Sequence, residues 1–164
     1  MQKTSPTTTA PAAGRFVFPA LVRWYAHGEG AAYALLRFGY GTIIFTHGLP
    51  KALGQSHGSM VNPMAGSIRM IGEVMGLPFA PQLAFLVMLL ETIGAAMLAL
   101  GLLTRPIALL MFIEMIAISY AMGPTWPWID RGIEYPVLLG LAALYMMLRG
   151  GGAYSLDSRM RHEI

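Results

Sequence analysis

The sequence contains no cysteine and little charge. The absence of cysteine among its 164 residues excludes thiol–disulfide exchange, thiolate metal sites and covalent haem attachment through this chain. Charged residues make up 12% of the chain, whereas soluble domains usually contain about 25%. Lys and Arg form no basic face, so the net charge of +3 does not indicate a nucleic-acid partner. A redox role would therefore need a partner protein or a diffusing cofactor.

Histidine is also scarce, and its spacing does not favour a metal or haem site. The four histidines include no i, i+4 pair that would place two ligands on one helix face. We therefore expect no metal. His57, Met60 and Met64 offer a soft ligand set for copper(I), but packing on lipid or protein is the simpler interpretation in a chain with 13 methionines.

Long apolar segments dominate what is present. The chain is 55% hydrophobic, with a mean hydropathy of +0.57. A lipid bilayer is crossed by roughly 20 apolar residues per helix. The sequence therefore predicts an all-α transmembrane four-helix bundle with spans near 31–50, 79–103, 106–122 and 133–150.

The segments outside these spans complete the predicted organisation. Residues 1–22 form a disordered or interfacial tail, residues 23–157 the membrane domain, and residues 158–164 a short cytoplasmic tail. Apolar residues at near-helical spacing in "SMVNPMAGSIRMIGEVMGLP" predict an interfacial amphipathic helix between spans one and two.

The distribution of Lys and Arg predicts the orientation. Cytoplasmic loops carry an excess of these residues. One side would hold Lys3, Arg15, Arg23, Arg105, Arg149, Arg159 and Arg161, and the other only Lys51, Arg69 and Arg131. We therefore expect a multi-pass protein of the bacterial inner membrane with both termini in the cytoplasm.

Three ionisable residues lie deep within the predicted spans: Arg37, Glu91 and Glu114. A charge at the centre of a membrane helix costs roughly 2.5–3.5 kcal/mol on insertion scales, so each needs a partner or a purpose. Matching their depths predicts a buried cluster in which Arg37 pairs with Glu91. Two interpretations stay open: a clamp that selects one helix packing, or a site for proton relay or ligand binding.

A second group of polar residues lies at the outer end of the first span, in "FTHGLPKALG". We expect His47 to face Glu134 and Lys51 to reach the lipid headgroups. Pro50 cannot donate to the carbonyl of Thr46, so the helix should loosen or bend there. Gly41 and Gly48 should let another helix approach closely.

Three segments resemble the DoxX family of small four-helix membrane proteins. They are "LLRFGYGTIIFTHGLPKALG", "LPFAPQLAFLVMLLETIGAAMLALGLLTRPIALLMFIEMIAI" and "GIEYPVLLGLAALYMMLRGGGAYSLD", which cover most of residues 35–157. The polar residues that match the family pattern are Arg37, His47, Lys51, Glu91, Arg105, Glu134, Tyr135 and Asp157. Glu114 is a candidate from its position in the span alone.

The resemblance implies a membrane subunit or accessory of a quinone-linked redox or oxidative-stress system. Relatives are linked to thiosulfate:quinone oxidoreductase subunits and to maturation of redox enzymes such as methylamine dehydrogenase. The implied cofactor is a quinone held between the helices, with none bound covalently. The implied partners are the lipid bilayer and either a protein of a membrane redox complex or a second copy of this chain. A non-catalytic assembly or anchoring factor and a small proton-coupled transporter are the alternatives, and whether the chain is an enzyme is left open.

Overall fold

The computed structural model describes residue 18 and residues 21–160, so most of the predicted N-terminal tail and the last four residues lie outside the described part. Helices account for most of the described chain, and no β-strand occurs within it. The predicted all-α class is therefore confirmed. The helices are α1 (Val22–Leu53), α2 (Pro63–Arg69), α3 (Ala80–Leu89), α4 (Ala95–Leu100), α5 (Thr104–Met122) and α6 (Glu134–Arg149).

Two π-helical turns extend or join these helices. The turn η3 (Met70–Val74) follows α2 directly. The turn η4 (Leu90–Gly94) joins α3 to α4, so that Ala80–Leu100 is one continuous helix. Short 3-10 turns, η5 (Trp128–Asp130) and η6 (Asp157–Arg159), lie in the loops on either side of α6.

Helix α1 does not end at Pro50. It continues to Leu53 and closes at Gly54, whose φ of 64° is readily adopted only by glycine. The backbone N–H of Gly54 donates to the carbonyl of Pro50, which helps to hold the last turn. The helix of the first span, predicted to end near residue 50, therefore continues for about one further turn.

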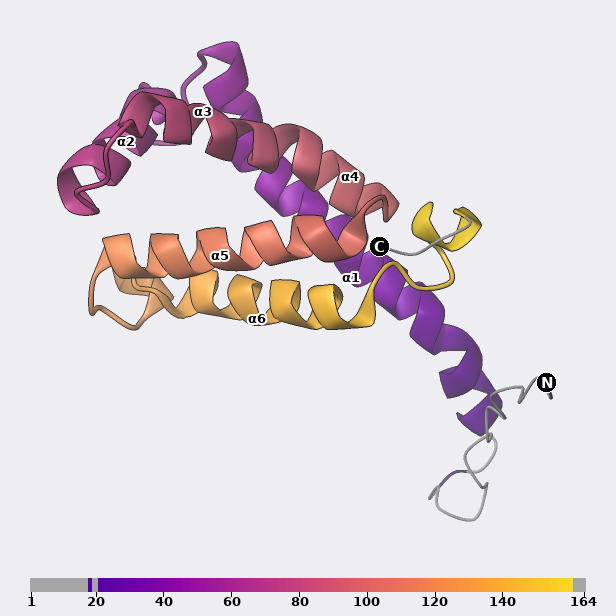
Figure 1. Cartoon of the computed structure of the whole chain (residues 1–164). Coiled ribbons are helices and arrows are strands. Elements are labelled where there is room, and N and C mark those ends of the chain that lie inside the picture. Colours follow the sequence, from indigo (N-terminus) through magenta and orange to yellow (C-terminus); the bar gives the residue numbers. More distant parts are fainter. Residues whose placement is uncertain (1–17, 19–20, 161–164) are drawn as a thin grey trace, which may run out of the picture.

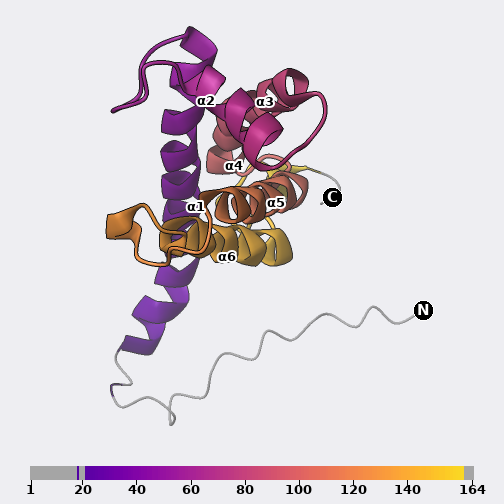
Figure 2. The same ribbon diagram turned by 90° about the vertical axis from the view of Figure 1, so that its left-hand side faces the viewer.

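The long helices are arranged as two crossing layers. Helices α5 and α6 are antiparallel and lie side by side, with the most extensive mutual contact in the fold (Figure 1). Helix α1 packs on η4 and α4 and crosses the α5–α6 pair steeply, as Figure 2 also shows. That four of these helices cross a membrane together as a bundle stays a prediction.

Two glycines allow α1 to approach the next helix closely. A Cβ atom built on Gly41 would lie 2.5 Å from the carbonyl oxygen of Ala95, and one on Gly48 would lie 2.6 Å from the carbonyl carbon of Glu91. Neither distance is possible for a real side chain. The predicted role of these glycines is confirmed.

The packing buries small side chains between helices and leaves many large apolar side chains exposed. Ala84, Ala95, Ala108 and Ala143 are completely buried. Large exposed apolar residues occur on every long helix, among them Leu35, Phe38, Leu86, Ile93, Ile113, Ile116, Leu138 and Leu141. Two helices, Ala80–Leu100 and Thr104–Met122, are long and apolar enough to cross a membrane. A helix also forms at Pro63–Val74, where we predicted one, and its location at an interface stays a prediction.

Candidate functional site

Three ionisable side chains from three helices meet inside the fold. Nζ of Lys51 on α1 donates to both carboxylate oxygens of Glu91 in η4, at 2.7 Å to Oε1 and 2.5 Å to Oε2. The side chains of Lys51 and Glu91 are only 11% and 6% exposed. Glu114 on α5 is equally buried and interacts electrostatically with both residues. We call Lys51, Glu91, Glu114 and the neighbouring Tyr40 the carboxyl cluster.

The local backbone explains how Lys51 and Glu91 meet. Glu91 lies in the π-helical turn of the Ala80–Leu100 helix, and such turns are often found at functional sites. Gly48 brings the backbone of α1 against Glu91, and Lys51 follows on α1 three residues later, on the same side of the helix. Close helix packing and the ion pair therefore depend on each other.

Glu114 differs from Glu91 in accepting no hydrogen bond. Neither of its buried carboxyl oxygens accepts one from any described residue, and the buried hydroxyl of Tyr40 has no hydrogen-bond partner among them either. Tyr40 interacts electrostatically with Glu114 and with Tyr135, which is 44% exposed on α6. A buried polar group without a partner is costly, so the carboxyl cluster contains hydrogen-bonding capacity that a ligand or a proton could use.

Arg37 belongs to a different region from the carboxyl cluster. Its guanidinium donates to the carbonyl oxygen of Gly151 and, at 2.6 Å, to that of Tyr154. The hydroxyl of Tyr33, one turn earlier on α1, donates to the carbonyl oxygen of Gly150 at 2.5 Å. The predicted Arg37–Glu91 pair is therefore wrong, because Arg37 is bound to the loop after α6 and Glu91 to Lys51.

Asp157 in that loop caps the start of α5. Its Oδ1 and Oδ2 accept hydrogen bonds from the backbone N–H groups of Leu103, at 2.7 Å, and Thr104, at 2.9 Å. A carboxylate at a helix N-terminus satisfies otherwise unpaired N–H groups and interacts favourably with the helix dipole. We call Tyr33, Arg37, Asp157 and the carbonyl groups of Gly150–Tyr154 the loop-end cluster.

The predicted pair of His47 and Glu134 is also wrong. Oε2 of Glu134 accepts a hydrogen bond from the backbone N–H of Trp128 at 3.1 Å. His47 is exposed, and its ring lies edge-to-face with that of His57 at a centroid distance of 5.0 Å. Lys51 does not extend to the lipid headgroups as expected, since Glu91 binds its ammonium group inside the fold.

The contacts of the remaining predicted residues do not indicate a binding site. Arg105 donates to the carbonyl of Leu148 at 3.4 Å. His57 and Met60 exchange backbone hydrogen bonds with each other. No group of three or more His, Asp or Glu residues that could hold a metal ion occurs within residues 18 and 21–160.

Two tyrosines contribute to these clusters without having been predicted to do so. Neither Tyr33 nor Tyr40 is among the predicted site residues. A usable signal was present, because Tyr33, Arg37 and Tyr40 follow steps of four and three on one face of α1. Both tyrosines are buried, with 5% and 3% of their surface exposed.

Comparison with known proteins gives two matches. The DoxX family model matches residues 32–124, a range that contains Arg37, Lys51, Glu91 and Glu114. The protein "Putative oxidoreductase CatD" of Bacillus subtilis (strain 168) is 30% identical over 123 residues, which cover 75% of this chain and 82% of that protein. No solved structure matches the chain.

Proposed function

Because the chain belongs to the DoxX family, we propose that it is a multi-pass protein of the bacterial inner membrane that serves as the membrane component of a quinone-linked redox or oxidative-stress system. The name of the Bacillus subtilis relative supports a redox role. The carboxyl cluster is the proposed site at which a quinone meets the protein, and the electrons come from a partner protein.

The proposal that four helical segments cross the membrane is supported by the direction in which their side chains point. Large apolar side chains face outward on α1 and α6 as well as on the two helices that are long and apolar enough to span, as expected for contact with lipid tails. The small, buried alanines then form the contacts between helices.

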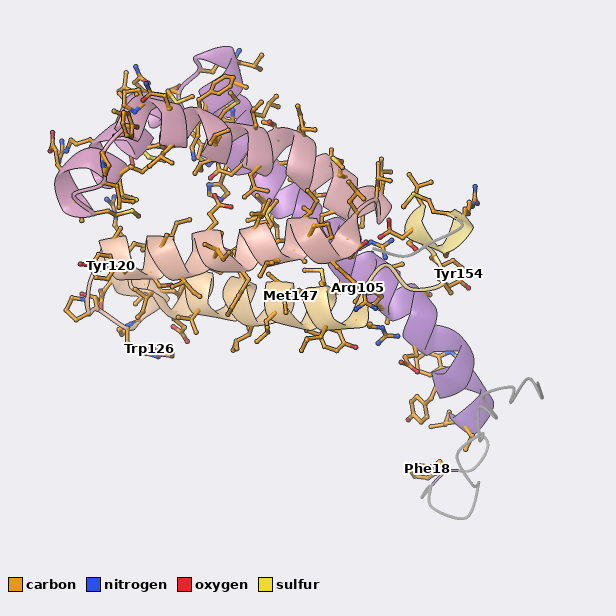
Figure 3. All side chains as sticks on the ribbon, viewed as in Figure 1. Phe18, Arg105, Tyr120, Trp126, Met147 and Tyr154 are labelled. Carbon is orange, nitrogen blue, oxygen red and sulfur yellow. The ribbon has the colours of Figure 1, made fainter. Side chains whose placement is uncertain are left out.

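The proposed orientation, with both termini in the cytoplasm, is supported by the two ends of the α5–α6 pair. The exposed Tyr120 and Trp126 lie at one end, where aromatic rings would anchor at the outer interface, and Arg105 and Tyr154 lie at the other (Figure 3). Arg105 at that second end follows the excess of Lys and Arg on the cytoplasmic side.

The observation that carries the proposed site is a buried carboxyl that accepts no hydrogen bond, beside a buried ion pair. Ionisable residues inside membrane helices are rare and usually mark pathways for ions, protons or substrates. Reduction of a quinone to a quinol takes up two electrons and two protons, so the site must offer a proton and hydrogen bonds to the quinone oxygens. Glu114 and Tyr40 have free hydrogen-bonding atoms for this purpose.

Glu91→Gln tests the proposal, with Glu73→Gln as the matched control. Glu73 is exposed and pairs with Arg69 at the surface, so its substitution should change nothing at the cluster. Each variant would be extracted from its native membrane in mild detergent, and quinone and partner proteins would be identified by mass spectrometry. We expect wild type and Glu73→Gln to retain quinone, and Glu91→Gln to lose it while still inserting and binding its partner.

Two other outcomes would support a different function. An assembly or anchoring factor would bind its partner without any quinone, and partner activity would survive Glu91→Gln. A proton-coupled transporter would move solute across liposomes that contain this protein alone. The buried, unpaired carboxyl gives the transporter its support, since such groups also carry protons in pumps.

A further inference from the structure

The carboxyl cluster contains more acidic groups than basic groups. Lys51 supplies one positive charge, and Glu91 and Glu114 supply up to two negative charges. The nearest other cation on α1, Arg37, is bound to the carbonyl groups of Gly151 and Tyr154. One negative charge is therefore left without a counter-charge if both carboxyls are ionised.

The hydrogen bonds indicate which of the two carboxyl groups lacks a counter-charge. Both oxygens of Glu91 accept from the ammonium group of Lys51, at 2.7 and 2.5 Å. Both oxygens of Glu114 lack any such bond. Burying an ionised carboxylate without a hydrogen bond or a counter-charge is far more costly than burying the neutral acid.

From this geometry we propose that Glu114 holds the single exchangeable proton of the carboxyl cluster, while Lys51 and Glu91 form a fixed ion pair. This inference deepens the proposed function and rests on it for the location of the cluster inside the membrane. Glu114 is then the proton donor of the site, and the ion pair is a positioning element that keeps Glu91 ionised.

The other groups that face Glu114 are consistent with this division. On α1 these are Tyr40 and Lys51, and on η4 Glu91. Tyr135 of α6 interacts electrostatically with Tyr40, and His47 of α1 interacts electrostatically with Glu91. The carboxylate of Glu91 is an acceptor toward which the Glu114 acid can donate in the resting state.

The proton step that follows is simple to balance. The O–H bond of Glu114 breaks, its proton forms an O–H bond with one oxygen atom of the reduced quinone, and Glu114 is left as a carboxylate. No electron passes through Glu114. A proton from water then restores the acid, because the unpaired carboxylate is costly in the fold. The restored acid delivers the second proton of the quinol in the same way, and water restores it again before the next cycle.

Infrared spectroscopy of the purified protein in lipid vesicles at neutral pH tests the proton count, without quinone or partner. Exposed carboxyls are ionised at this pH, so a carboxylic-acid C=O band reports only a buried acid. We expect this band in wild type and Glu73→Gln, and its loss in Glu114→Gln. In Lys51→Met no cation remains, so both carboxyls should be protonated and the band should grow about twofold.

Labelling with an apolar carbodiimide tests the assignment to Glu114. The O–H of a carboxylic acid adds across a C=N bond of the reagent, and the product rearranges to a stable N-acylurea that peptide mass spectrometry locates. We expect the adduct on Glu114 in wild type, and on both Glu91 and Glu114 in Lys51→Met.

Several results would overturn the inference. In the infrared experiment, they are the absence of the acid band in wild type, a band that does not grow in Lys51→Met, and a band that sodium ions abolish at constant pH. In the labelling experiment, they are an adduct on Glu91 alone or on neither glutamate. Loss of the band with sodium ions would make the cluster a cation site. A failure of the proposed function, with no quinone or partner found, would leave these spectra and adducts unchanged, so the two failures are distinguishable.

Discussion

The loop-end cluster and the carboxyl cluster both bury charged side chains among apolar helices, but they differ in how their polar atoms are partnered. In the loop-end cluster, Asp157 uses both oxygens and Arg37 binds two carbonyl groups, with only its Nε left without a partner. In the carboxyl cluster, Glu114 accepts no hydrogen bond. The first arrangement satisfies most of its buried polar atoms, whereas the second leaves two buried carboxyl oxygens without a donor.

The two clusters also differ in what they connect. Arg37 and Gly151 are 114 residues apart in sequence, so their bond ties the first long helix to the loop after the last one. Lys51 and Glu91 join α1 to the adjacent helix, where Gly41 and Gly48 already bring the backbones together. Substitutions should therefore affect stability most in the loop-end cluster and function most in the carboxyl cluster.

Arg37→Met should have the largest effect on stability. It keeps most of the buried aliphatic volume but removes two charge-assisted hydrogen bonds and leaves the carbonyls of Gly151 and Tyr154 unpaired. We expect a loss of about 3 kcal/mol or more in the free energy of unfolding, measured by denaturation in detergent micelles. Arg69→Met is the control, since Arg69 is 76% exposed and should change stability by less than about 0.5 kcal/mol. Equal stability of the two variants would contradict a structural role for the loop-end cluster.

Gly48→Ala should have the next largest effect and should also reach the carboxyl cluster. The added Cβ would lie 2.6–2.8 Å from backbone and side-chain atoms of Glu91, so α1 and η4 must separate. We expect a loss of about 1–3 kcal/mol, measured in the same denaturation assay. The carboxylic-acid infrared band should also change, because Lys51 is displaced from Glu91.

Gly39→Ala is the matched control for Gly48→Ala. It lies on the same helix, and apart from its chain neighbours and the nearby backbone of α1 no described atom lies within 4 Å of the position that an added Cβ would take, so alanine should be neutral or stabilise α1 by up to about 1 kcal/mol. If both substitutions behave alike, close packing of α1 against η4 is not what holds the ion pair.

Asp157→Asn should have a moderate effect that is confined to the loop-end cluster. Asparagine offers one acceptor oxygen instead of two, and it removes the negative charge at the start of α5. We expect a loss of about 1 kcal/mol with no change in the infrared band of the carboxyl cluster. Asp130→Asn, at an exposed position in η5, is the control and should leave the unfolding transition where it is.

The sequence predicted the helices more accurately than the contacts between them. Hydrophobic runs and glycine or proline breaks indicated each long helix, and the depth of Glu91 and Glu114 in their spans indicated that both would be buried. The predicted proximity of Glu91 and Glu114 is confirmed, whereas the predicted partner Arg37 was wrong because depth matching assumes that all spans are centred on the same plane. Gly48 packs directly on Glu91, so Lys51, near the end of α1, reaches Glu91 near the middle of the next helix.

The contacts of Arg37 could not be predicted for a different reason. Its partners are backbone carbonyl groups, which every residue has and which no sequence pattern distinguishes. The glycines at 150–152 indicated the end of the last helix, but the path by which the loop returns over Arg37 and Gly101 depends on packing. Asp157 was a recognisable match to the family, yet its role as a cap for α5 became visible only when the loop was placed beside Leu103 and Thr104.

Glu114→Gln should have the smallest effect on stability and therefore gives the sharpest contrast with Arg37→Met. Glutamine has nearly the shape of the neutral acid, Glu114 accepts no hydrogen bond that could be lost, and the glutamine amide can still donate toward Glu91. If Glu114 is neutral in the resting protein, the substitution removes no charge, and the free energy of unfolding should change by less than about 1 kcal/mol. The measurement is the same denaturation assay, paired with the quinone content of the protein extracted from its native membrane. The substitution replaces the oxygen that carries the proton with an amide nitrogen. A stable variant without quinone would therefore show that this oxygen is needed for quinone binding but not for helix packing. A loss of stability as large as that of Arg37→Met would instead show that Glu114 holds the helices together.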